Sequence, residues 1–318
     1  MNRTQLNVMA MGAAYRAQKE FHVDPTLRVD VFKVLEQAGA YVFFRPLKSM
    51  YGAYLPIRDS VGLLINSNLP LSVQRYTAAH EFGHYYLKHK TLSLEKDLDF
   101  VAENRALVDE DEITAEAFAA FFLMPKPLVV NSIRDLDVGA PEIDSESAYL
   151  LALRMGTSYR ATINQLHTYK LISKSHALDL KQSVPKEVKL KLNDNEGVGR
   201  HDVWLLNENW HGKHIYPAPA DTIRIRLKEI PSSGYTWLLG DEPQGMSVQE
   251  EGYREEESGI GGTRIHQFTA RLDDNALTTT LKLEKKRPWE AGKLEDFAVA
   301  VHPQEFRKTG PLVLPKLA

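Results

Sequence analysis

The sequence predicts a multidomain α+β protein in which a mixed helix-and-strand domain, a small helical segment and an all-β domain follow one another. The hydrophobic pattern predicts this fold class because it changes twice along the chain. Helical spacing mixes with short apolar runs up to about residue 130, continues alone to about residue 180, and gives way to period-two alternation. The length of 318 residues also indicates two or three domains. We therefore predict domains over residues 1–132, 133–184 and 185–318.

The composition excludes several kinds of chemistry. The chain has no cysteine, so disulfides, thiolate metal ligands and a cysteine nucleophile are ruled out. Its 39 basic and 42 acidic residues give a net charge of −3, which argues against a strongly basic nucleic-acid-binding protein. The apolar run 6–15 is too short for a membrane span, and Val8, Met11 and Tyr15 predict a surface-packed amphipathic helix there. We expect a cytoplasmic protein without a membrane partner.

The first domain is predicted to contain two strands and two long helices, at residues 40–44, 62–66, 71–89 and 111–123. The strand segments are short apolar runs, and the helix segments repeat apolar residues every three or four positions. Pro125, Pro127 and the polar stretch 134–147 mark the end of this domain.

His80, Glu81 and His84 form the pattern His-Glu-x-x-His on the first of these helices. Residues four apart share one face of a helix, so both imidazoles can bind one cation. Glu81 is too close to His80 to ligate beside it, but it is well placed to take a proton from a reacting water molecule. The alternative is two ordinary surface histidines, because so short a pattern recurs by chance.

A catalytic zinc site needs a third protein ligand, and the helix at 111–123 begins among carboxylates. Glu112 and Glu116 share one face of that helix, so Glu112 is a candidate ligand and Glu116 a candidate for orienting a histidine. The three acids before Glu112 suit a helix N-terminus electrostatically. Residues 95–116 hold nine acids and two bases, so spacing alone does not choose the ligand.

Residues from about 30 to 125 resemble the ImmA/IrrE family of metallopeptidases. The matching stretches are Val29 to Phe32, Gly52 to Leu55, Gly62 to Asn66, Arg75 to His84, and Glu112 together with Phe118 to Pro125. The resemblance implies a zincin-like domain in which His80, His84 and Glu112 bind zinc and Glu81 is the general base. A site of two histidines and one glutamate also accepts manganese.

Two further roles follow from the resemblance. The strand at 61–66 would bind the substrate backbone as an added edge strand, through Leu64, Ile65 and Asn66. Glu116 would support a metal-binding histidine, although the family usually has Asp or Asn at that position.

No residue that stabilises the oxyanion is identifiable. Tyr51, Tyr54 and His89 are candidates, but packing or a surface position explains each of them better. His89 follows His84 by five residues, which turns it away from the ligand face of a regular helix. We therefore expect His89 to be an ordinary helix-end histidine.

Residues 148–172 resemble a helix-turn-helix in which the first helix ends at Gly156 and Ser158 caps the second. Members of the ImmA/IrrE family often carry such a segment behind the peptidase domain. Basic residues are few there, namely Arg154, Arg160, Lys170 and Lys174. Because DNA phosphates require more positive charge, we favour packing or substrate docking over DNA binding.

Residues 185–318 alternate apolar and polar positions, as at Ile223, Ile225 and Leu227, which predicts half-buried strands. Turns rich in Gly, Pro and Asp separate these segments, which is typical of a β-sandwich. The stretch 240–262 holds seven acids and one arginine, so we expect a solvated loop there.

Three loops of this last domain resemble the chagasin-like inhibitors of cysteine peptidases. In that family the loops lie at one end of an immunoglobulin-like sandwich and enter the cleft of papain-like enzymes. The implied contact residues are Gly234, Tyr235, Trp237, Gly261, Gly262, Arg287, Pro288 and Trp289. Ile230 departs from the Asn that is common before the first loop. The alternative is that both tryptophans belong to the core, that the glycines only make turns, and that the domain senses or recognises a substrate.

The leading hypothesis is a zinc endopeptidase that cuts a protein partner. The resemblance implies that this partner is a helix-turn-helix repressor, whose cleavage switches on a stress, mobile-element or defence response. The second hypothesis is a binding protein whose β domain inhibits or captures a papain-like cysteine peptidase or another partner. The third is a DNA-associated regulator that acts through residues 133–184.

Overall fold

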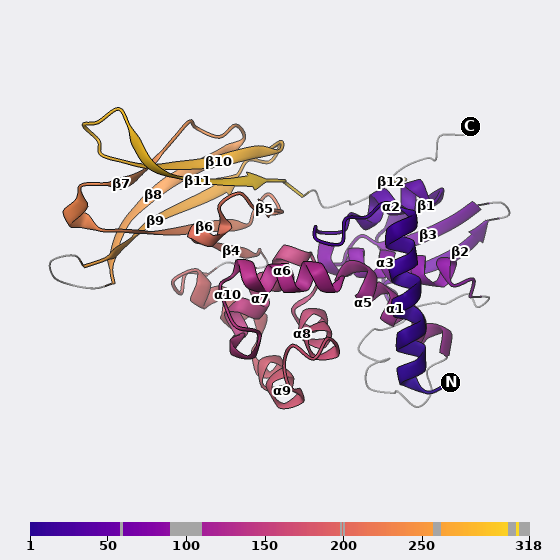
Figure 1. The fold of residues 1–318 in the computed structure, drawn as a ribbon. Coiled ribbons are helices and arrows are strands. Elements are labelled where there is room, and N and C mark those ends of the chain that lie inside the picture. The colour runs from indigo at the N-terminus through magenta and orange to yellow at the C-terminus, as the bar shows by residue number, and fades with distance from the viewer. Residues whose placement is uncertain are drawn as a thin grey trace. The chain divides into compact units, whose positions relative to one another are not determined.

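The computed structural model describes residues 1–57, 60–89, 110–197, 199, 201–256, 262–304 and 310–311, and the protein is a mixed α+β structure (Figure 1). The chain divides into two compact units. Unit 1 contains residues 1–132, 155–177 and 306–318, and unit 2 contains residues 133–154 and 178–305. The middle helical segment is therefore shared between the two units, and the predicted boundaries at 132 and 184 stay predictions.

Unit 1 contains a four-stranded mixed sheet with the strand order β12-β1-β3-β2. Its strands are β1 (Ala40–Arg45), β2 (Gly52–Ile57), β3 (Ser60–Asn66) and β12 (Gly310–Pro311). Strand β3 is parallel to β1 and antiparallel to β2, and β12 is antiparallel to β1. The predicted strands at 40–44 and 62–66 are confirmed. The pattern did not reveal β2, because Gly52 and Pro56 disfavour a strand interior, and β2 lies at the sheet edge where both are tolerated.

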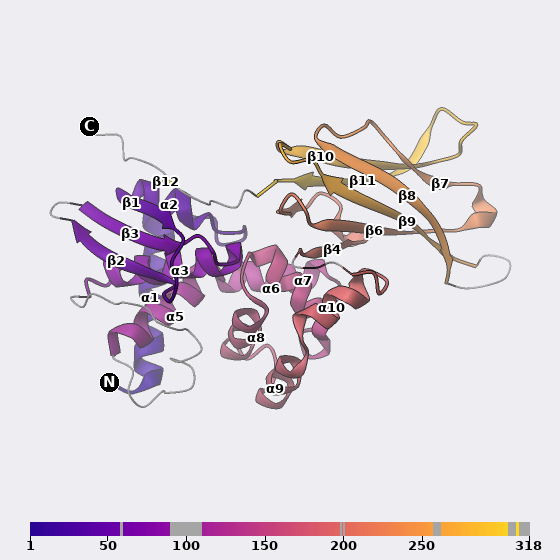
Figure 2. The ribbon, with the colours of Figure 1, turned by 180° about the vertical axis from the view of Figure 1, so that it is seen from behind.

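The helices α1 (Arg3–Glu20), α3 (Leu71–Tyr86) and α5 (Glu110–Leu123) pack together beside this sheet (Figures 1 and 2). Helix α3 packs directly on β2 and β3, and α5 packs on both α3 and α1. The shorter helices of unit 1 are α2 (Val31–Gln37), α6 (Lys126–Asp135, which continues into unit 2) and α8 (Tyr159–Thr168). The predicted helices at 71–89 and 111–123 are thus present, but the first ends three residues early.

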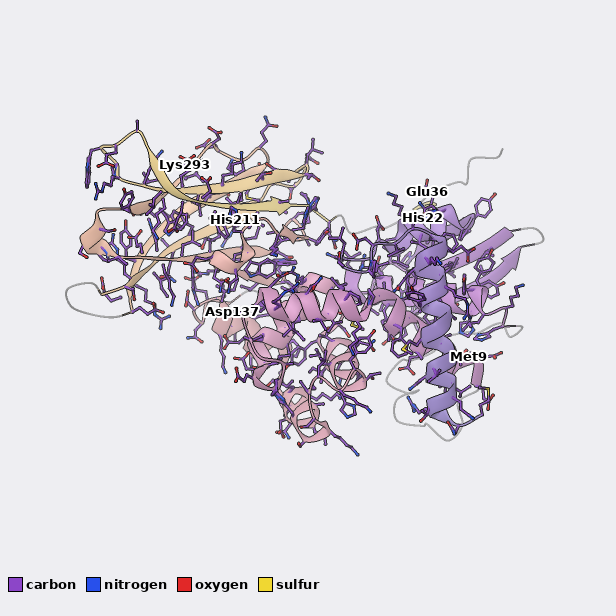
Figure 3. All side chains as sticks on the ribbon, viewed as in Figure 1. Met9, His22, Glu36, Asp137, His211 and Lys293 are labelled. Atoms are coloured by element: carbon purple, nitrogen blue, oxygen red, sulfur yellow. The ribbon has the colours of Figure 1, made fainter. Side chains whose placement is uncertain are left out.

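Helix α1 packs through small side chains rather than through the apolar residues at helical spacing. Its buried face consists of Leu6, Gln18 and the alanines at 10, 13, 14 and 17. Val8, Met11 and Tyr15 are exposed instead, as is Met9 (Figure 3). Because alanine side chains are small, a face built from them lets two helices approach closely. This explains why α1 buries its alanines and exposes its larger apolar side chains.

The crossing of α3 and α5 is equally close. A Cβ atom on Gly83 would lie 3.1 Å from Phe118 and 3.3 Å from the backbone of Ala115. Around this point Phe82 packs edge-on against Phe118 and Phe122, whose rings are stacked with centroids 5.5 Å apart. The glycine and the aromatic cluster hold the two helices at a separation that lets polar side chains on one reach those on the other.

The middle segment forms α7 (Ser145–Met155), α8, α9 (Lys174–Gln182) and α10 (Pro185–Leu192). Ser158 caps α8 as predicted, because its side chain accepts a hydrogen bond from Ala161 N. Most of α7 belongs to unit 2, whereas α8 belongs to unit 1. Within unit 1, buried Arg75 donates to the carbonyls of Gly156 and Val29, which fixes the turn before α8.

Unit 2 contains two four-stranded sheets around one core, with the strand orders β4-β6-β9-β8 and β5-β11-β10-β7. The strands are β4 (Val203–Leu206), β5 (His214–Ile215), β6 (Thr222–Glu229), β7 (Thr236–Leu239), β8 (Met246–Glu255), β9 (Arg264–Leu272), β10 (Thr279–Lys286) and β11 (Lys293–Val301). The predicted alternation in β6 is confirmed, since Ile223, Ile225 and Leu227 are buried. The acidic stretch 240–262 was expected to be a loop, but β8 occupies much of it. Because β8 is an edge strand, its charged side chains remain in water.

In the described part of the chain, no single helix is long and apolar enough to cross a membrane. Helices α5 and α6 reach that length and hydropathy only when taken together, and a bend of 46° separates them.

Candidate functional site

Helix α3 carries the three residues of the His-Glu-x-x-His pattern on its buried side. His80, Glu81 and His84 are each at most 2 % exposed. His80 and His84 lie one turn apart, and their Nε2 atoms are 3.0 Å from each other. The interpretation of two ordinary surface histidines is therefore wrong.

Glu112 reaches the same point from α5. One carboxylate oxygen lies 3.3 Å from His80 Nε2, and the other lies 3.5 Å from His84 Nε2. The three side chains each direct one potential ligand atom to this point, and these atoms lie within 4.8 Å of one another. Burial alone would raise the pKa of Glu112, but the adjacent imidazoles of His80 and His84 hold it well below its usual range.

The donor set fits a metal ion such as zinc. With zinc–ligand distances of about 2.0–2.1 Å, neighbouring ligand atoms of a tetrahedral site lie about 3.3 Å apart. The donor separations of 3.0, 3.3 and 3.5 Å are close to this value. Two imidazoles and one carboxylate also leave the fourth position of a tetrahedron to water or substrate, as in catalytic sites.

Glu81 lies next to the edge strand of the sheet. A Cβ atom on Gly52, the first residue of β2, would be 3.6 Å from Glu81 Oε1, 2.5 Å from Thr77 Cγ2 and 2.7 Å from the carbonyl oxygen of Leu64. No side chain fits there, so a glycine is required at this position. The absence of a side chain lets β2 pass close to the carboxylate on α3.

The prediction for His89 is wrong. Helix α3 ends at Tyr86, and Lys88 then adopts a left-handed conformation with φ of 58°, so the rule for a regular helix does not apply. His89 N donates to His84 O at 3.0 Å, and His89 Nδ1 lies 3.0 Å from His84 Nδ1. Burial lowers the pKa of His89 below its ordinary value. The position of His89 just beyond the end of α3 was the one available signal, because the chain can reverse direction at a helix end.

The role predicted for the Glu116 side chain stays a prediction. Its backbone carbonyl accepts a hydrogen bond from Tyr76 Oη at 3.1 Å. Within the described residues, the side chain that contacts the second ring nitrogen of His84 is His89.

The predicted substrate strand is also corrected. Strand β3, which contains Leu64, Ile65 and Asn66, is hydrogen-bonded to β1 on one side and to β2 on the other, so it offers no free edge. Asn66 is buried, and its side chain bonds to backbone groups of Leu47, Met50 and Asn68, which orders the connection before β2. The sequence showed a strand here but not which strands pair with it.

The three chagasin-like loops are only partly covered by the described residues. Gly261 lies outside them, and Gly262 is half-buried. Pro288 is exposed and Trp289 is 72 % exposed, and the missing Cβ of Gly234 (φ of 75°) makes room for the Trp289 ring. Arg287 joins two of the loops, because its guanidinium lies over the Tyr235 ring and donates to the carbonyl of Ser233.

Trp237, in contrast, is a core residue and offers no contact surface. It is 2 % exposed, and its indole Nε1 donates to the carbonyl of Lys228 at 3.1 Å. Period-two alternation explains the difference, since Trp237 lies in β7 with its side chain directed between the sheets. The alternative interpretation of this residue as sandwich core is the correct one.

A buried ionic cluster lies under the first loop. Glu229 accepts a hydrogen bond of 2.6 Å from Arg264 Nε and one of 3.2 Å from Trp237 N, and Arg264 Nη2 forms an ion pair with it at 2.6 Å. The fully buried ring of His266 lies between Glu229, at 3.5 Å, and Glu250, at 2.8 Å. Burial alone would raise the pKa of Glu229, but the hydrogen bonds from His266 and Arg264 lower it below its ordinary value.

Comparisons with known proteins agree with this geometry. Residues 35–142 match the peptidase family M78, described as the IrrE N-terminal-like domain, and residues 218–301 match the chagasin family of peptidase inhibitors, I42. No curated protein matches the chain significantly.

Among solved structures, the cysteine protease inhibitor EhICP2 from Entamoeba histolytica is 25% identical, with 33% of this chain and 99% of that chain covered and a TM-score of 0.30. Amebosin is 25% identical over 33% and 100% of the two chains, with a TM-score of 0.28. PbICP-C, solved in complex with falcipain-2, is 14% identical over 33% and 91%, with a TM-score of 0.24.

Both resemblances seen in the sequence are thus confirmed. The chain combines a segment that matches the M78 peptidase family, which indicates a metallopeptidase, with a segment that matches the chagasin family of peptidase inhibitors.

Proposed function

We propose that unit 1 is a zinc-dependent endopeptidase whose metal is held by His80, His84 and Glu112. The observation that carries the proposal is the convergence of these three donors, from two helices, at separations of 3.0–3.5 Å. The match to the M78 peptidase family supports the same assignment. Manganese fits this donor set as well, so the native metal belongs to the test.

Each residue of the centre then has a distinct task. A bound zinc ion supplies the positive charge that polarises the peptide carbonyl and makes a water molecule more acidic. Glu81 is the next residue on the helix after the ligand His80, and it accepts the proton of the attacking water as general base. Its burial keeps bulk water away from that proton transfer.

The substrate backbone is proposed to pair with β2 rather than β3. Tyr51 O accepts a hydrogen bond from Asn66 N, so alternation along an antiparallel pair directs the backbone groups of Gly52 and Tyr54 away from β3. Within the described residues these groups have no backbone partner, so they offer an edge beside Glu81 where an extended peptide can add as a strand. The position of β2 at the edge of the sheet supports this assignment. The substrate cannot pair with β3, the strand that the sequence predicts, because β3 is paired on both sides.

The biological substrate is suggested by the resemblance to the ImmA/IrrE family. We propose a helix-turn-helix repressor in the cytoplasm, whose cleavage switches on a stress, mobile-element or defence response.

The test uses Glu81→Gln in the full-length protein loaded with zinc or manganese. Peptides from a proteome digest serve as substrates, and mass spectrometry counts the new N-termini. We expect Glu81→Gln to bind zinc as the wild type does and to lose hydrolysis by at least about 100-fold, since a positioned base contributes 10²–10⁴-fold. Glu36→Gln, at an exposed glutamate of α2, is the control and should cleave normally. Unchanged cleavage by Glu81→Gln would refute the mechanism.

A second candidate function belongs to unit 2. We propose that its loop tips bind the cleft of a papain-like cysteine peptidase, because Trp289 is 72 % exposed and its ring lies against Gly234 of a neighbouring loop. The full-length protein is titrated against papain, with Trp289→Ala expected to weaken inhibition by at least tenfold. Leu277→Ala, at an 80 % exposed residue outside the three loops, is the control. No inhibition by the wild type at micromolar concentration contradicts this function.

A further inference from the structure

The second ring nitrogen of His84 has an unusual partner. A metal-binding histidine generally donates this N–H to a carboxylate, a backbone carbonyl or water. In unit 1 the partner is another imidazole, His89, with the two Nδ1 atoms 3.0 Å apart. We propose that His89 is a positioning residue that fixes the tautomer and the ring orientation of the metal ligand His84. This inference rests on the proposed function, because it concerns the same metal centre.

The directions of the hydrogen bonds follow from the far side of His89. Thr114 Oγ1 lies 3.0 Å from the carbonyls of both Glu110 and Asp111, so its single hydrogen is donated to the backbone. His89 Nε2 lies 3.3 Å from Thr114 Oγ1 and 3.5 Å from a carboxylate oxygen of Asp111. Both of these oxygens accept, so His89 Nε2 carries the hydrogen.

The tautomer of His89 determines the tautomer of His84. A neutral imidazole has one N–H and one acceptor nitrogen, so His89 Nδ1 accepts. His84 Nδ1 must then donate, which leaves a lone pair on His84 Nε2. That is the nitrogen that lies 3.5 Å from Glu112 and 3.0 Å from His80 Nε2. The chain from Thr114 through His89 therefore prepares His84 for metal binding before the metal arrives.

The backbone holds His89 in this position at a cost. The left-handed conformation of Lys88 is unfavourable for a residue with a side chain. It lets His89 N bond to His84 O, so backbone and side chain of His89 both contact the same ligand. The side chain of His89 is 7 % exposed, and its ring meets the His84 ring edge-on at 5.0 Å. Little space remains in which either ring could turn.

The test measures zinc affinity of the metal-free full-length protein by competition with a chelator. His89→Leu removes both ring nitrogens, and His89→Asn keeps an acceptor oxygen near the position of Nδ1. We expect His89→Leu to weaken zinc binding by about 10–100-fold, the usual effect of losing such a partner. His89→Asn should stay within about threefold of the wild type, and Thr114→Val should lie between them. His167→Leu, at an exposed histidine of α8, is the control and should bind normally.

The outcomes separate this inference from the proposed function. Wild-type zinc affinity in His89→Leu overturns the inference, and equal loss in His89→Leu and His89→Asn overturns its hydrogen-bond basis. Glu112→Gln tests the centre itself: if it binds zinc as the wild type does, the proposed metal site fails. If only Glu112→Gln loses affinity, the site stands and the role of His89 fails. Thermal unfolding of the metal-free variants shows whether His89→Leu folds, and if it does not, His89→Asn and Thr114→Val decide.

Discussion

Substituting Gly52 by alanine should separate β2 from α3. A Cβ atom there would lie 2.5 Å from Thr77 Cγ2 and 2.7 Å from the carbonyl oxygen of Leu64. Apolar carbon atoms pack at about 3.5–4.0 Å, so the strand or the helix must move by roughly 1 Å. Such overpacking costs about 1–3 kcal/mol, and contact with backbone places Gly52→Ala near the upper end. We expect a loss of about 2–3 kcal/mol in the free energy of unfolding.

The cost should depend on the Thr77 methyl group. Thr77→Ser removes Cγ2 and by itself should cost about 1 kcal/mol, as for one buried methyl group. The double variant should be more stable than the sum of the two single effects predicts, by about 0.5–1 kcal/mol. Thr77→Ser should restore only part of the stability that Gly52→Ala loses, because the new Cβ atom still contacts Leu64 O.

Urea unfolding provides the assay, with an internal control in the sequence. All four tryptophans lie in unit 2, so their fluorescence follows that unit, whereas far-ultraviolet circular dichroism also follows unit 1. Gly52→Ala should shift the dichroism transition and leave the fluorescence transition in place. Gly12→Ala is the matched control, since its Cβ would lie 3.5 Å from Arg16 Nη1, an ordinary contact with a flexible side chain, and helix propensity should stabilise it by about 1 kcal/mol. Wild-type stability of Gly52→Ala would refute the close approach of β2 and α3.

Further substitutions test other features. Lys88→Gly should stabilise unit 1 by about 1 kcal/mol in thermal unfolding and keep zinc affinity, because glycine adopts the left-handed conformation without strain; destabilisation would contradict the turn. Glu229→Gln should destabilise unit 2 by about 1–3 kcal/mol, followed by tryptophan fluorescence, because Arg264 loses its charged partner. Since the folded pKa of Glu229 is lowered, its contribution is present above the unfolded pKa of about 4.5 and is lost as pH falls below it. Glu229→Gln should therefore flatten the acid side of the stability curve, and an unchanged slope would exclude Glu229 as its cause.

Local patterns were enough to predict the elements that carry the metal centre. The spacing of His80 and His84 on a helix required only the geometry of four residues, and the strands at 40–44 and 62–66 only short apolar runs. Glu112 could not be chosen from nine neighbouring acids by spacing, because its position depends on how closely α5 approaches α3 at Gly83. The resemblance to a family supplied that choice.

The errors came from features that are not local. Pairing of β3 with two neighbours depends on the whole sheet, so the sequence did not show that its edge was closed. His89 was excluded by extending a helix to residue 89, whereas the left-handed conformation at Lys88 reverses the chain first. Lysine gives no signal for such a turn, unlike glycine or asparagine.

The pairing of β12 with β1 has a consequence for the order in which the protein forms. Residues 310 and 311 complete a sheet whose other strands lie between residues 40 and 66, and the residues of unit 2 lie between these segments in the chain. During synthesis, β1, β2 and β3 emerge from the ribosome long before their last neighbour, so the outer edge of β1 stays unpaired while unit 2 is made. Until Gly310 emerges, that edge is open to pairing with other chains, and translation that stops earlier would leave it so.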